Sequence, residues 1–147
     1  MGQAGVLAVV LAVVASAWLI TLSVFDIRHR RLPDRLTLPG AVAVLAGAAL
    51  CGHGAGAVLG AVVLFAVYAV VHLVAPAAMG AGDAKLAIGV GALTGAFGPD
   101  VWVLAALGAP LLTAVPASVV MLRGGRTVPH GPAMCLSAAV AVAGAVL

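Results

Sequence analysis

Acidic residues are scarce in this chain, and two of them stand where acid–base chemistry is possible. The sequence contains no Glu and only four Asp residues, which are Asp26, Asp34, Asp83 and Asp100. Asp26 closes one long apolar run, and Asp83 opens another. An ionisable side chain at membrane depth is costly, so both residues are candidate functional residues.

A pair of carboxylates can divide the acid and base roles of one reaction. Two carboxylates that lie close together in a low-dielectric site repel each other, and one then holds its proton more tightly than the other. The ionised member can activate water as a general base, while the protonated member protonates the carbonyl oxygen or the leaving amine of a peptide bond. This chemistry needs neither a metal ion nor a nucleophilic Ser or Cys.

The residues just before Asp83 add to its candidacy. Gly80 and Gly82 form a Gly-Ala-Gly-Asp segment with Ala81 and Asp83. Glycine permits backbone angles that are closed to other residues, and an extended substrate could pair with such a backbone by strand addition. The simpler alternative is that both acids cap helix ends, because Asp is a favoured N-cap residue and Asp83 stands where a helix should start.

The other polar residues predict no metal site. The histidines have no ligand-like spacing, and we expect neither a metal ion nor a cofactor; they are His29, His53, His72 and His130. Cys51 and Cys135 are too few for a disulfide framework and lack CxxC spacing. Asp34 and Asp100 each follow a proline; Asp34 is predicted to be a turn or cap residue, and Asp100 a turn residue.

The composition defines the class of protein. Of the 147 residues, 65% are hydrophobic and 7% are charged, and the mean hydropathy is +1.29. A soluble domain carries about 25% charged residues, so a soluble, disordered or collagen-like chain is excluded. The net charge of +3 would be compatible with nucleic acid, but aromatic residues make up only 4% and do not alternate with basic ones. We therefore expect an integral membrane protein with no nucleic-acid partner.

Polar or Gly/Pro-rich breaks separate six apolar runs. A helix needs about 20 mostly apolar residues to cross the hydrocarbon core, so the runs predict an all-α integral membrane protein with about six transmembrane helices. The expected spans are 5–25, 36–50, 58–74, 84–97, 101–122 and 132–147. No soluble loop is long, and residues 1–147 are predicted to form a single membrane domain. The first run has no basic residue before it and continues to Phe25, which favours an uncleaved helix over a signal peptide.

The charges divide the loops into two groups. Loops one, three and five contain all the basic residues, which are Arg28, Arg30, Arg31, Arg35, Lys85, Arg123 and Arg126. The positive-inside rule then places these loops in the cytoplasm and both termini outside. Asp26 and Asp83 are thereby predicted to face one cavity at the cytoplasmic face of the cell membrane. Cys51 and Cys135 fall near opposite faces and should not form a disulfide, and the arginines of the first loop are expected to attract anionic lipid.

Two glycine pairs match the GxxxG helix-packing pattern. They are Gly56–Gly60 and Gly91–Gly95. Chance matches are expected in a chain with 19 glycines. We therefore predict only that these positions let helices approach closely.

Three segments, in order along the chain, resemble the motifs of the prepilin peptidase family. Residues 25–37 (FDIRHRRLPDRLT) resemble the first aspartate motif, with its basic stretch, proline turn and Leu-Thr. Residues 80–86 (GAGDAKL) resemble the GxGD motif and the Lys-Leu that follows it. Residues 128–133 (VPHGPA) resemble a Pro-Phe-Gly-Pro-like turn before the last helix.

The resemblance implies an intramembrane aspartyl protease of the GxGD class. Such enzymes remove the basic leader from type IV prepilins or related pseudopilins at the cytoplasmic membrane face, in type IV pilus assembly and protein secretion. Asp26 and Asp83 match the catalytic pair. The other matching motif positions, with implied roles in substrate approach, are Gly80, Gly82, Lys85, Pro33, Gly131 and Pro132.

The chain departs from the family pattern at three points. Asp34 stands where the family often has Asn, and His130 stands where Phe is usual. The zinc-binding CxxC pairs of the longer, bifunctional members are absent, so we expect leader cleavage without N-methylation. The short form resembles the peptidases that serve tight-adherence pili or archaeal-type filaments.

Two other classes of function stay open at this point. A small transporter or proton-pathway subunit could use Asp26 and Asp83 to carry protons, but it would need a path across the bilayer. A peptidase-like scaffold without turnover is the third possibility.

Overall fold

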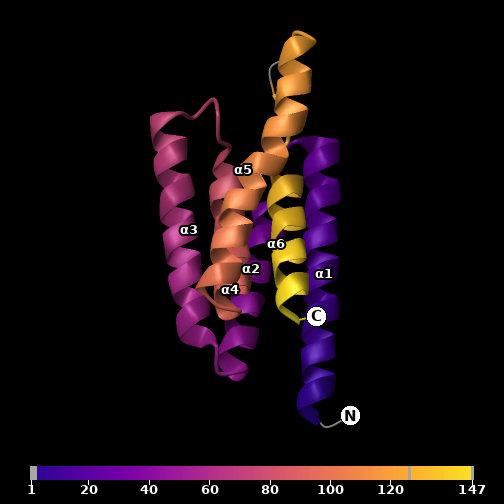
Figure 1. The fold of residues 1–147 in the computed structure, drawn as a ribbon, viewed down its shortest axis with the longest axis vertical. Coiled ribbons are helices and arrows are strands. Elements are labelled where there is room, and N and C mark those ends of the chain that lie inside the picture. The colour runs from indigo at the N-terminus through magenta and orange to yellow at the C-terminus, as the bar shows by residue number, and fades with distance from the viewer. Residues whose placement is uncertain (1–2, 126, 147) are drawn as a thin grey trace.

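The computed structural model describes residues 3–125 and 127–146, and this part of the chain is helical without any strand (Figure 1). Its six helices are α1 (Gln3–His29), α2 (Asp34–Leu50), α3 (Gly54–Val74), α4 (Ala81–Ala96), α5 (Pro99–Leu122) and α6 (Gly131–Val146). The expected all-α class is confirmed. Each helix overlaps one expected span, although several begin or end a turn away from the sequence-based bounds.

The membrane character follows from helix length and from the surface. Three stretches are long and apolar enough to cross a membrane, namely Val9–His29, Gly54–Val74 and Pro99–Leu122, and α6 is a shorter apolar helix. Large apolar side chains cover the outside, with exposed fractions of 79% at Leu73 and 88% at Leu122. α2 and α4 have 17 and 16 residues, so six complete spans stay a prediction.

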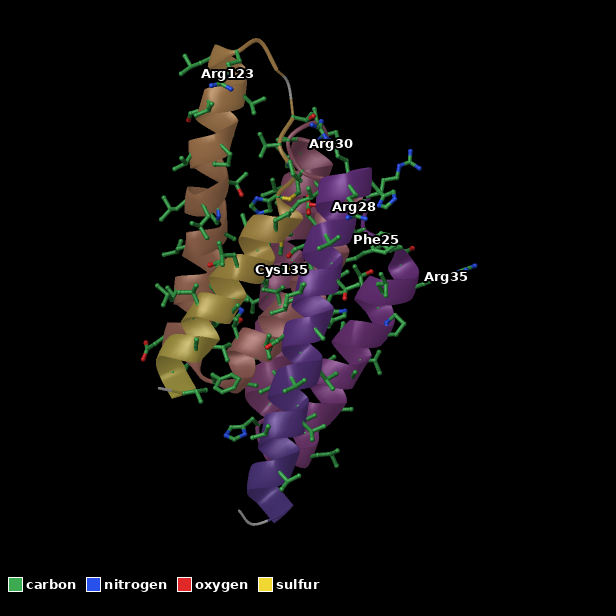
Figure 2. The ribbon with its side chains drawn as sticks, turned by 90° about the vertical axis from the view of Figure 1, so that its right-hand side faces the viewer. Phe25, Arg28, Arg30, Arg35, Arg123 and Cys135 are labelled. Carbon is green, nitrogen blue, oxygen red and sulfur yellow. The ribbon has the colours of Figure 1, made fainter. Side chains whose placement is uncertain are left out.

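One end of the helix bundle gathers the basic residues, and we call it the basic end. α1 ends there, and the α3–α4 and α5–α6 connections lie there, while the start of α1 and the end of α6 lie toward the other end (Figure 1). Arg28, Arg30 and Arg123 lie toward this end, and Arg35 lies in the first turn of α2 (Figure 2). Arg126, which the sequence places in the same group, lies outside the described residues. The arrangement agrees with the predicted grouping of the loops, and the side of the membrane stays a prediction.

The first connection is shorter than expected, because α1 continues past Asp26 to His29. Arg28 and His29 occupy its last turn, where positive charge interacts favourably with the helix dipole. Arg30 follows with a φ of 50°, the left-handed conformation that commonly ends a helix. Pro33, in an extended conformation, then precedes α2. Asp26 therefore lies inside the last turn of α1.

α4 is the central helix, and it packs most closely against α3. An added Cβ at Gly56 would lie 2.6 Å from the carbonyl oxygen of Gly95, and one at Gly95 would lie 2.5 Å from that of Gly56. Gly60 and Gly91 oppose each other in the same way, each against the other's carbonyl oxygen. The two GxxxG pairs thus face each other, and only glycine allows the backbones to come this close.

Trp18 joins α1, α2 and α4. Its indole N–H donates a hydrogen bond to the Leu36 carbonyl oxygen at 2.8 Å. The ring lies directly against Gly40 of α2 and Gly89 of α4, where a Cβ would overlap it. The contact fixes α1 next to the two helices whose N-terminal ends carry Asp34 and Asp83.

The remaining sequence-based expectations concern two aspartates, the two cysteines and the end of the last span. Asp100 lies in the first turn of α5, directly after Pro99, and Asp34 is the first residue of α2. Cys51 is exposed, Cys135 is buried, and both are free thiols. The last expected span reaches Leu147, which lies outside the described residues.

Candidate active site

A cavity of about 290 Å³ opens at the basic end of the molecule. It lies where the end of α1 and the connection to α2 meet the start of α4. Its lining residues are Asp26, Arg30, Arg31, Leu32, Asp34, Gly80, Ala81, Gly82, Asp83 and Lys85. Asp26 and Asp83, which come from different helices, therefore line one cavity.

Asp26 is buried, with an exposed fraction of 6%, and the chain supplies a hydrogen-bond donor for it. The backbone N–H of Gly131 donates to Asp26 Oδ2 at 3.0 Å. Gly131 is the first residue of α6, and helix N-termini favour a negative charge. A Cβ at Gly131 would lie 2.6 Å from Asp26 Oδ2, so only glycine leaves room for the carboxylate.

Asp83 is half-buried and lies in the first turn of α4. Gly80, in an extended conformation, is the N-cap of this helix, so Asp83 does not occupy the cap position. The Asp83 backbone N–H donates to the Gly80 carbonyl oxygen at 3.1 Å. A Cβ at Gly80 would lie 3.2 Å from Asp83 Oδ2, which shows that the carboxylate turns back over the glycine.

Gly82 lies in the cavity wall, where it contacts Leu32 closely. A Cβ there would lie 3.2 Å from the Cβ of Leu32, in the connection between α1 and α2. The connection can therefore lie directly over the start of α4, which brings the end of α1 and its Asp26 toward Asp83. The two carboxylates lie close enough for the charge of Asp26 to act on Asp83.

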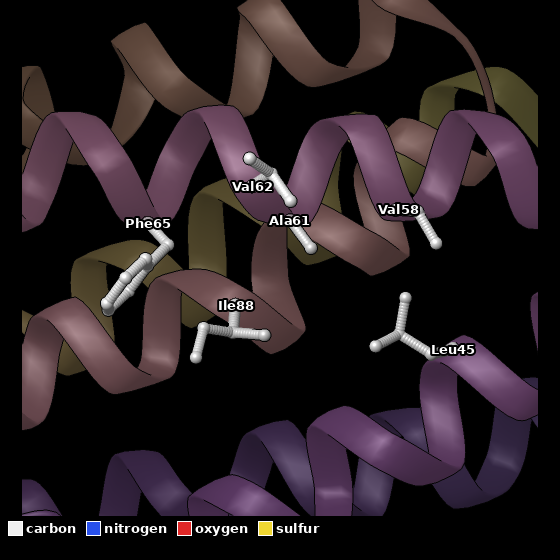
Figure 3. Close-up of a pocket in the computed structure, with 6 residues that line it drawn as sticks. All are labelled: Leu45, Val58, Ala61, Val62, Phe65 and Ile88. Carbon is white, nitrogen blue, oxygen red and sulfur yellow. The ribbon is translucent and has the colours of Figure 1, made fainter.

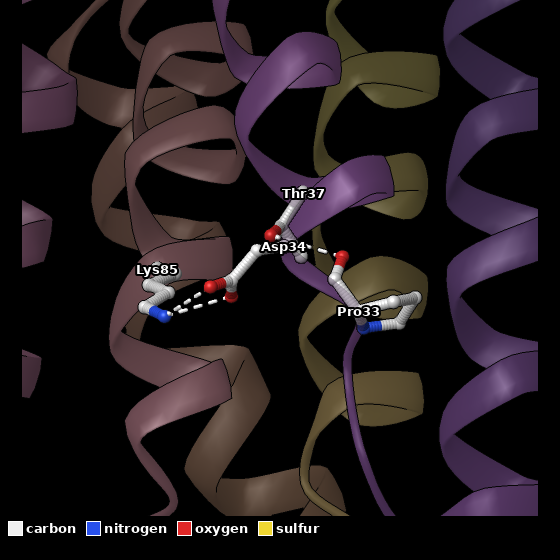
Figure 4. Close-up of polar contacts among 4 residues, drawn as sticks. All are labelled: Pro33, Asp34, Thr37 and Lys85. Carbon is white, nitrogen blue, oxygen red and sulfur yellow. Dashed lines mark hydrogen bonds and ion pairs between the residues drawn. The ribbon is translucent and has the colours of Figure 1, made fainter.

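Lys85 and Asp34 form an ion pair at the rim of the cavity (Figure 4). The Lys85 ammonium donates to Asp34 Oδ1 at 2.7 Å and to Oδ2 at 2.8 Å. Beside it, the hydroxyl of the buried Thr37 donates to the Pro33 carbonyl oxygen at 3.3 Å and steadies the first turn of α2. Asp34 is thus a rim residue bound to a lysine, where the sequence predicted a turn or cap residue.

Three of the motif residues lie outside the cavity lining. Pro33 precedes α2, and Pro132 lies in the first turn of α6. Gly131 contacts Asp26 through its backbone without lining the cavity. The sequence favoured a role in topology and lipid binding for Arg30 and Arg31 over a direct role with the substrate, and both line the cavity.

The sequence did not predict the hydrogen bonds that His130 makes. His130 Nε2 lies 3.0 Å from the Tyr68 hydroxyl, and Nδ1 lies 2.6 Å from the Thr113 hydroxyl. Burial lowers the pKa of His130, which keeps the ring neutral at pH 7. Tyr68 and Thr113 stand alone within apolar runs, so no spacing pattern could have revealed the contact.

Other features of the described residues add no reactive group. No group of three or more His, Cys, Asp or Glu side chains that could hold a metal ion occurs among them. A second hollow, of about 210 Å³, lies between α2, α3 and α4 (Figure 3). It is lined only by hydrocarbon side chains, which are Leu45, Val58, Ala61, Val62, Phe65 and Ile88.

The fold and the cavity together define a helical membrane protein that places two aspartates in one site. A family model described as the type IV leader peptidase family matches residues 13–147, and the chain belongs to this family. The match contains all three motifs and confirms the resemblance seen in the sequence. Membership indicates a peptidase with a prepilin-like substrate. Comparisons with curated proteins and with solved structures returned no match.

Proposed function

We propose that this protein is an aspartic endopeptidase of the membrane that removes the basic leader from a type IV prepilin or pseudopilin. The observation that carries the proposal is that Asp26 and Asp83 line one cavity. Asp34, the third acid in the lining, is bound to Lys85 and is less available for chemistry. Membership of a peptidase family favours hydrolysis over proton transport or a purely structural role.

In the proposed reaction the two carboxylates share one proton. The ionised carboxylate takes a proton from water, and the water oxygen attacks the carbonyl carbon of the scissile peptide bond. The protonated carboxyl gives its proton to the carbonyl oxygen, which forms a tetrahedral intermediate. The carboxyl that took the proton from water then gives it to the leaving nitrogen as the C–N bond breaks. One hydroxyl proton of the intermediate returns to the other carboxylate, which restores the shared proton. No metal ion or cofactor enters this scheme, and we propose cleavage without N-methylation.

The Gly131 N–H orients one of these carboxylates, because it holds Asp26 Oδ2 at a fixed position. The glycines of the GxGD segment leave the Asp83 side of the cavity open to an extended substrate. Gly80 and Gly82 carry no side chain that would block a peptide at the cavity wall. The scissile bond would then lie between the two carboxylates.

The orientation in the membrane is part of the same proposal. Residues 1–147 would form one multi-pass domain of the cell membrane with about six spans and with both termini outside. The cavity would open at the cytoplasmic face, where the arginines around it would contact anionic lipid. Cys51 tests this orientation, because it is an exposed thiol whereas Cys135 is buried. A membrane-impermeant maleimide should label Cys51 in intact cells, and labelling only after lysis would contradict the orientation.

The catalytic assignment is tested by isosteric substitution. Asp26→Asn and Asp83→Asn should each abolish leader removal from a co-expressed prepilin while the protein still inserts in the membrane. Asp100→Asn is the matched control, since Asp100 lies at the start of α5 and does not line the cavity. N-terminal sequencing of the pilin identifies the cleaved bond. Normal processing by either Asp26→Asn or Asp83→Asn would contradict the proposal.

A further inference from the structure

His130 joins the helices that surround the candidate active site. Its ring contacts Tyr68 of α3 through Nε2 and Thr113 of α5 through Nδ1. Its backbone carbonyl accepts the Met134 N–H at 3.1 Å, the first hydrogen bond of α6. The following residue, Gly131, is the donor to Asp26 on α1. One residue of the α5–α6 connection therefore links four helices.

The directions of these hydrogen bonds follow from the chemistry of the partners. Thr113 Oγ1 lies 2.9 Å from the Ala109 carbonyl oxygen, which can only accept, so the hydroxyl proton points there. The same oxygen must then accept from His130, which places the ring proton on Nδ1. Nε2 is left with a lone pair and accepts from the Tyr68 hydroxyl. All the polar atoms of the group are satisfied only when His130 is neutral.

The group is part-buried, and Tyr68 is its buried member. Tyr68 has an exposed fraction of 6% and belongs to the main apolar core, together with Leu22 and Met134. It also lies within electrostatic reach of Asp83. At its other end the α5–α6 connection is held by Arg30, whose guanidinium donates to the Thr127 hydroxyl at 2.6 Å. Contacts at Thr127 and at His130 thus hold the segment that leads to the Gly131 N–H.

We propose that His130 is a positioning residue for catalysis: through Tyr68 and Thr113 it holds the Gly131 N–H on Asp26 Oδ2 and fixes the orientation of that carboxylate. This inference rests on the proposed function. It goes beyond the family motif, because the resembling motif has Phe at this position and a phenyl ring can make neither hydrogen bond. In this chain the imidazole ring holds the α5–α6 connection by hydrogen bonds, whereas a phenyl ring could hold it only by packing.

The kinetic test uses His130→Phe, which keeps a ring of similar size and removes both hydrogen bonds. The substrate is a peptide that spans a prepilin leader junction, and rates are normalised to folded enzyme in detergent. We expect kcat to fall about tenfold, the effect of one or two lost buried hydrogen bonds on the reacting geometry. KM should change less than about twofold, because His130 does not line the cavity that receives the substrate.

A double-mutant cycle separates positioning from a general loss of packing. Tyr68→Phe removes one of the two bonds and should lower kcat by no more than His130→Phe does. The double variant should lose no more than His130→Phe alone, because that change already removes the bond to Tyr68. His53→Phe is the matched control, since His53 is exposed in the connection between α2 and α3. Its kcat and KM should equal those of the wild type.

Nitrogen NMR of the histidine rings tests the geometry without any turnover. In wild-type protein at pH 7, the signal that disappears in His130→Phe should be that of a neutral ring protonated at Nδ1. The Gly131 amide proton, hydrogen-bonded to a carboxylate, should move upfield in the same variant. A ring protonated at Nε2, or an unmoved Gly131 amide, would overturn the proposal.

The two proposals fail in different ways. Cleavage by Asp26→Asn would overturn the proposed function. An inactive Asp26→Asn together with a His130→Phe variant of unchanged kcat would overturn only the positioning role. An additive loss in the double variant would also overturn it, because Tyr68 and His130 would then act independently.

Discussion

Gly131→Ala should displace the carboxylate of Asp26, one of the two residues proposed to be catalytic. The new methyl group would lie 2.6 Å from Asp26 Oδ2 and 3.1 Å from its Cγ. An ordinary carbon–oxygen contact needs about 3.4 Å, so Oδ2 must withdraw by about 0.8 Å. The bond from the Gly131 N–H, now 3.0 Å, would stretch to about 3.8 Å and be lost.

The magnitude follows from this displacement. A hydrogen bond to a charged group contributes about 1.5–3 kcal/mol, which corresponds to a rate factor of about 10 to 150. A misplacement of about 1 Å at a reacting group costs on the order of 100-fold in rate, which is the same range. We therefore expect kcat for leader cleavage to fall about 10- to 100-fold.

The assay measures cleavage of a leader-junction peptide by purified enzyme in lipid nanodiscs. Gly144→Ala is the control, because Gly144 lies in the same helix and an added Cβ there meets no atom within 4 Å. Alanine is the better helix former by about 1 kcal/mol, so neither variant should lose helix stability for that reason. A Gly131→Ala enzyme with a kcat within about twofold of the Gly144→Ala control would refute the reasoning.

Three further predictions concern packing, the rim and pH. Gly91→Ala places a methyl group against the Gly60 carbonyl oxygen, and this overpacking should lower the free energy of unfolding by about 1–3 kcal/mol, measured by thermal unfolding in detergent. Asp34→Asn should destabilise the fold by at most about 1 kcal/mol and leave a cleaving enzyme, because the ion pair with Lys85 is exposed; complete loss of cleavage would mean that Asp34 takes part in catalysis. Burial lowers the pKa of His130 from 6.5. Below about pH 6.5 the unfolded chain therefore binds a proton that the folded chain does not, and the free energy of unfolding should decrease as the pH is lowered. Thermal midpoints at pH 7.5 and 5.5 should therefore differ less in His130→Phe than in the wild type, and equal differences would contradict this assignment.

The apolar runs predicted the helices because lipid-facing segments need little more than length and hydropathy. The bounds failed where polar residues continue a helix. α1 extends past Asp26 because Arg28 and His29 are favourable in a last helical turn, and the sequence instead suggested that the helix ends at Phe25. α4 begins at Ala81, inside a glycine-rich segment that resembled a loop.

The sequence predicted the two aspartates of the candidate site, but it did not predict the residues that hold them by hydrogen bonds. Asp26 and Asp83 stood out because a charge at the end of an apolar run is costly. The donor to Asp26 is a backbone N–H. Every residue except proline carries this group, so no residue type in the sequence indicates which one donates. The partners of His130 depend on how α3 and α5 pack, and a single Tyr68 or Thr113 in an apolar helix has no periodicity to reveal that packing.

The hydrogen bond between α1 and α6 sets an order of events during biosynthesis. A nascent chain that has inserted α1 to α5 already carries Asp26 and Asp83, but Gly131 follows them by many residues of translation. Until the start of α6 is in place, Asp26 lacks its donor. Under the proposed mechanism, proteolytic competence would arise only after the sixth helix is in place, so incomplete chains stalled on the ribosome would insert without cutting their neighbours.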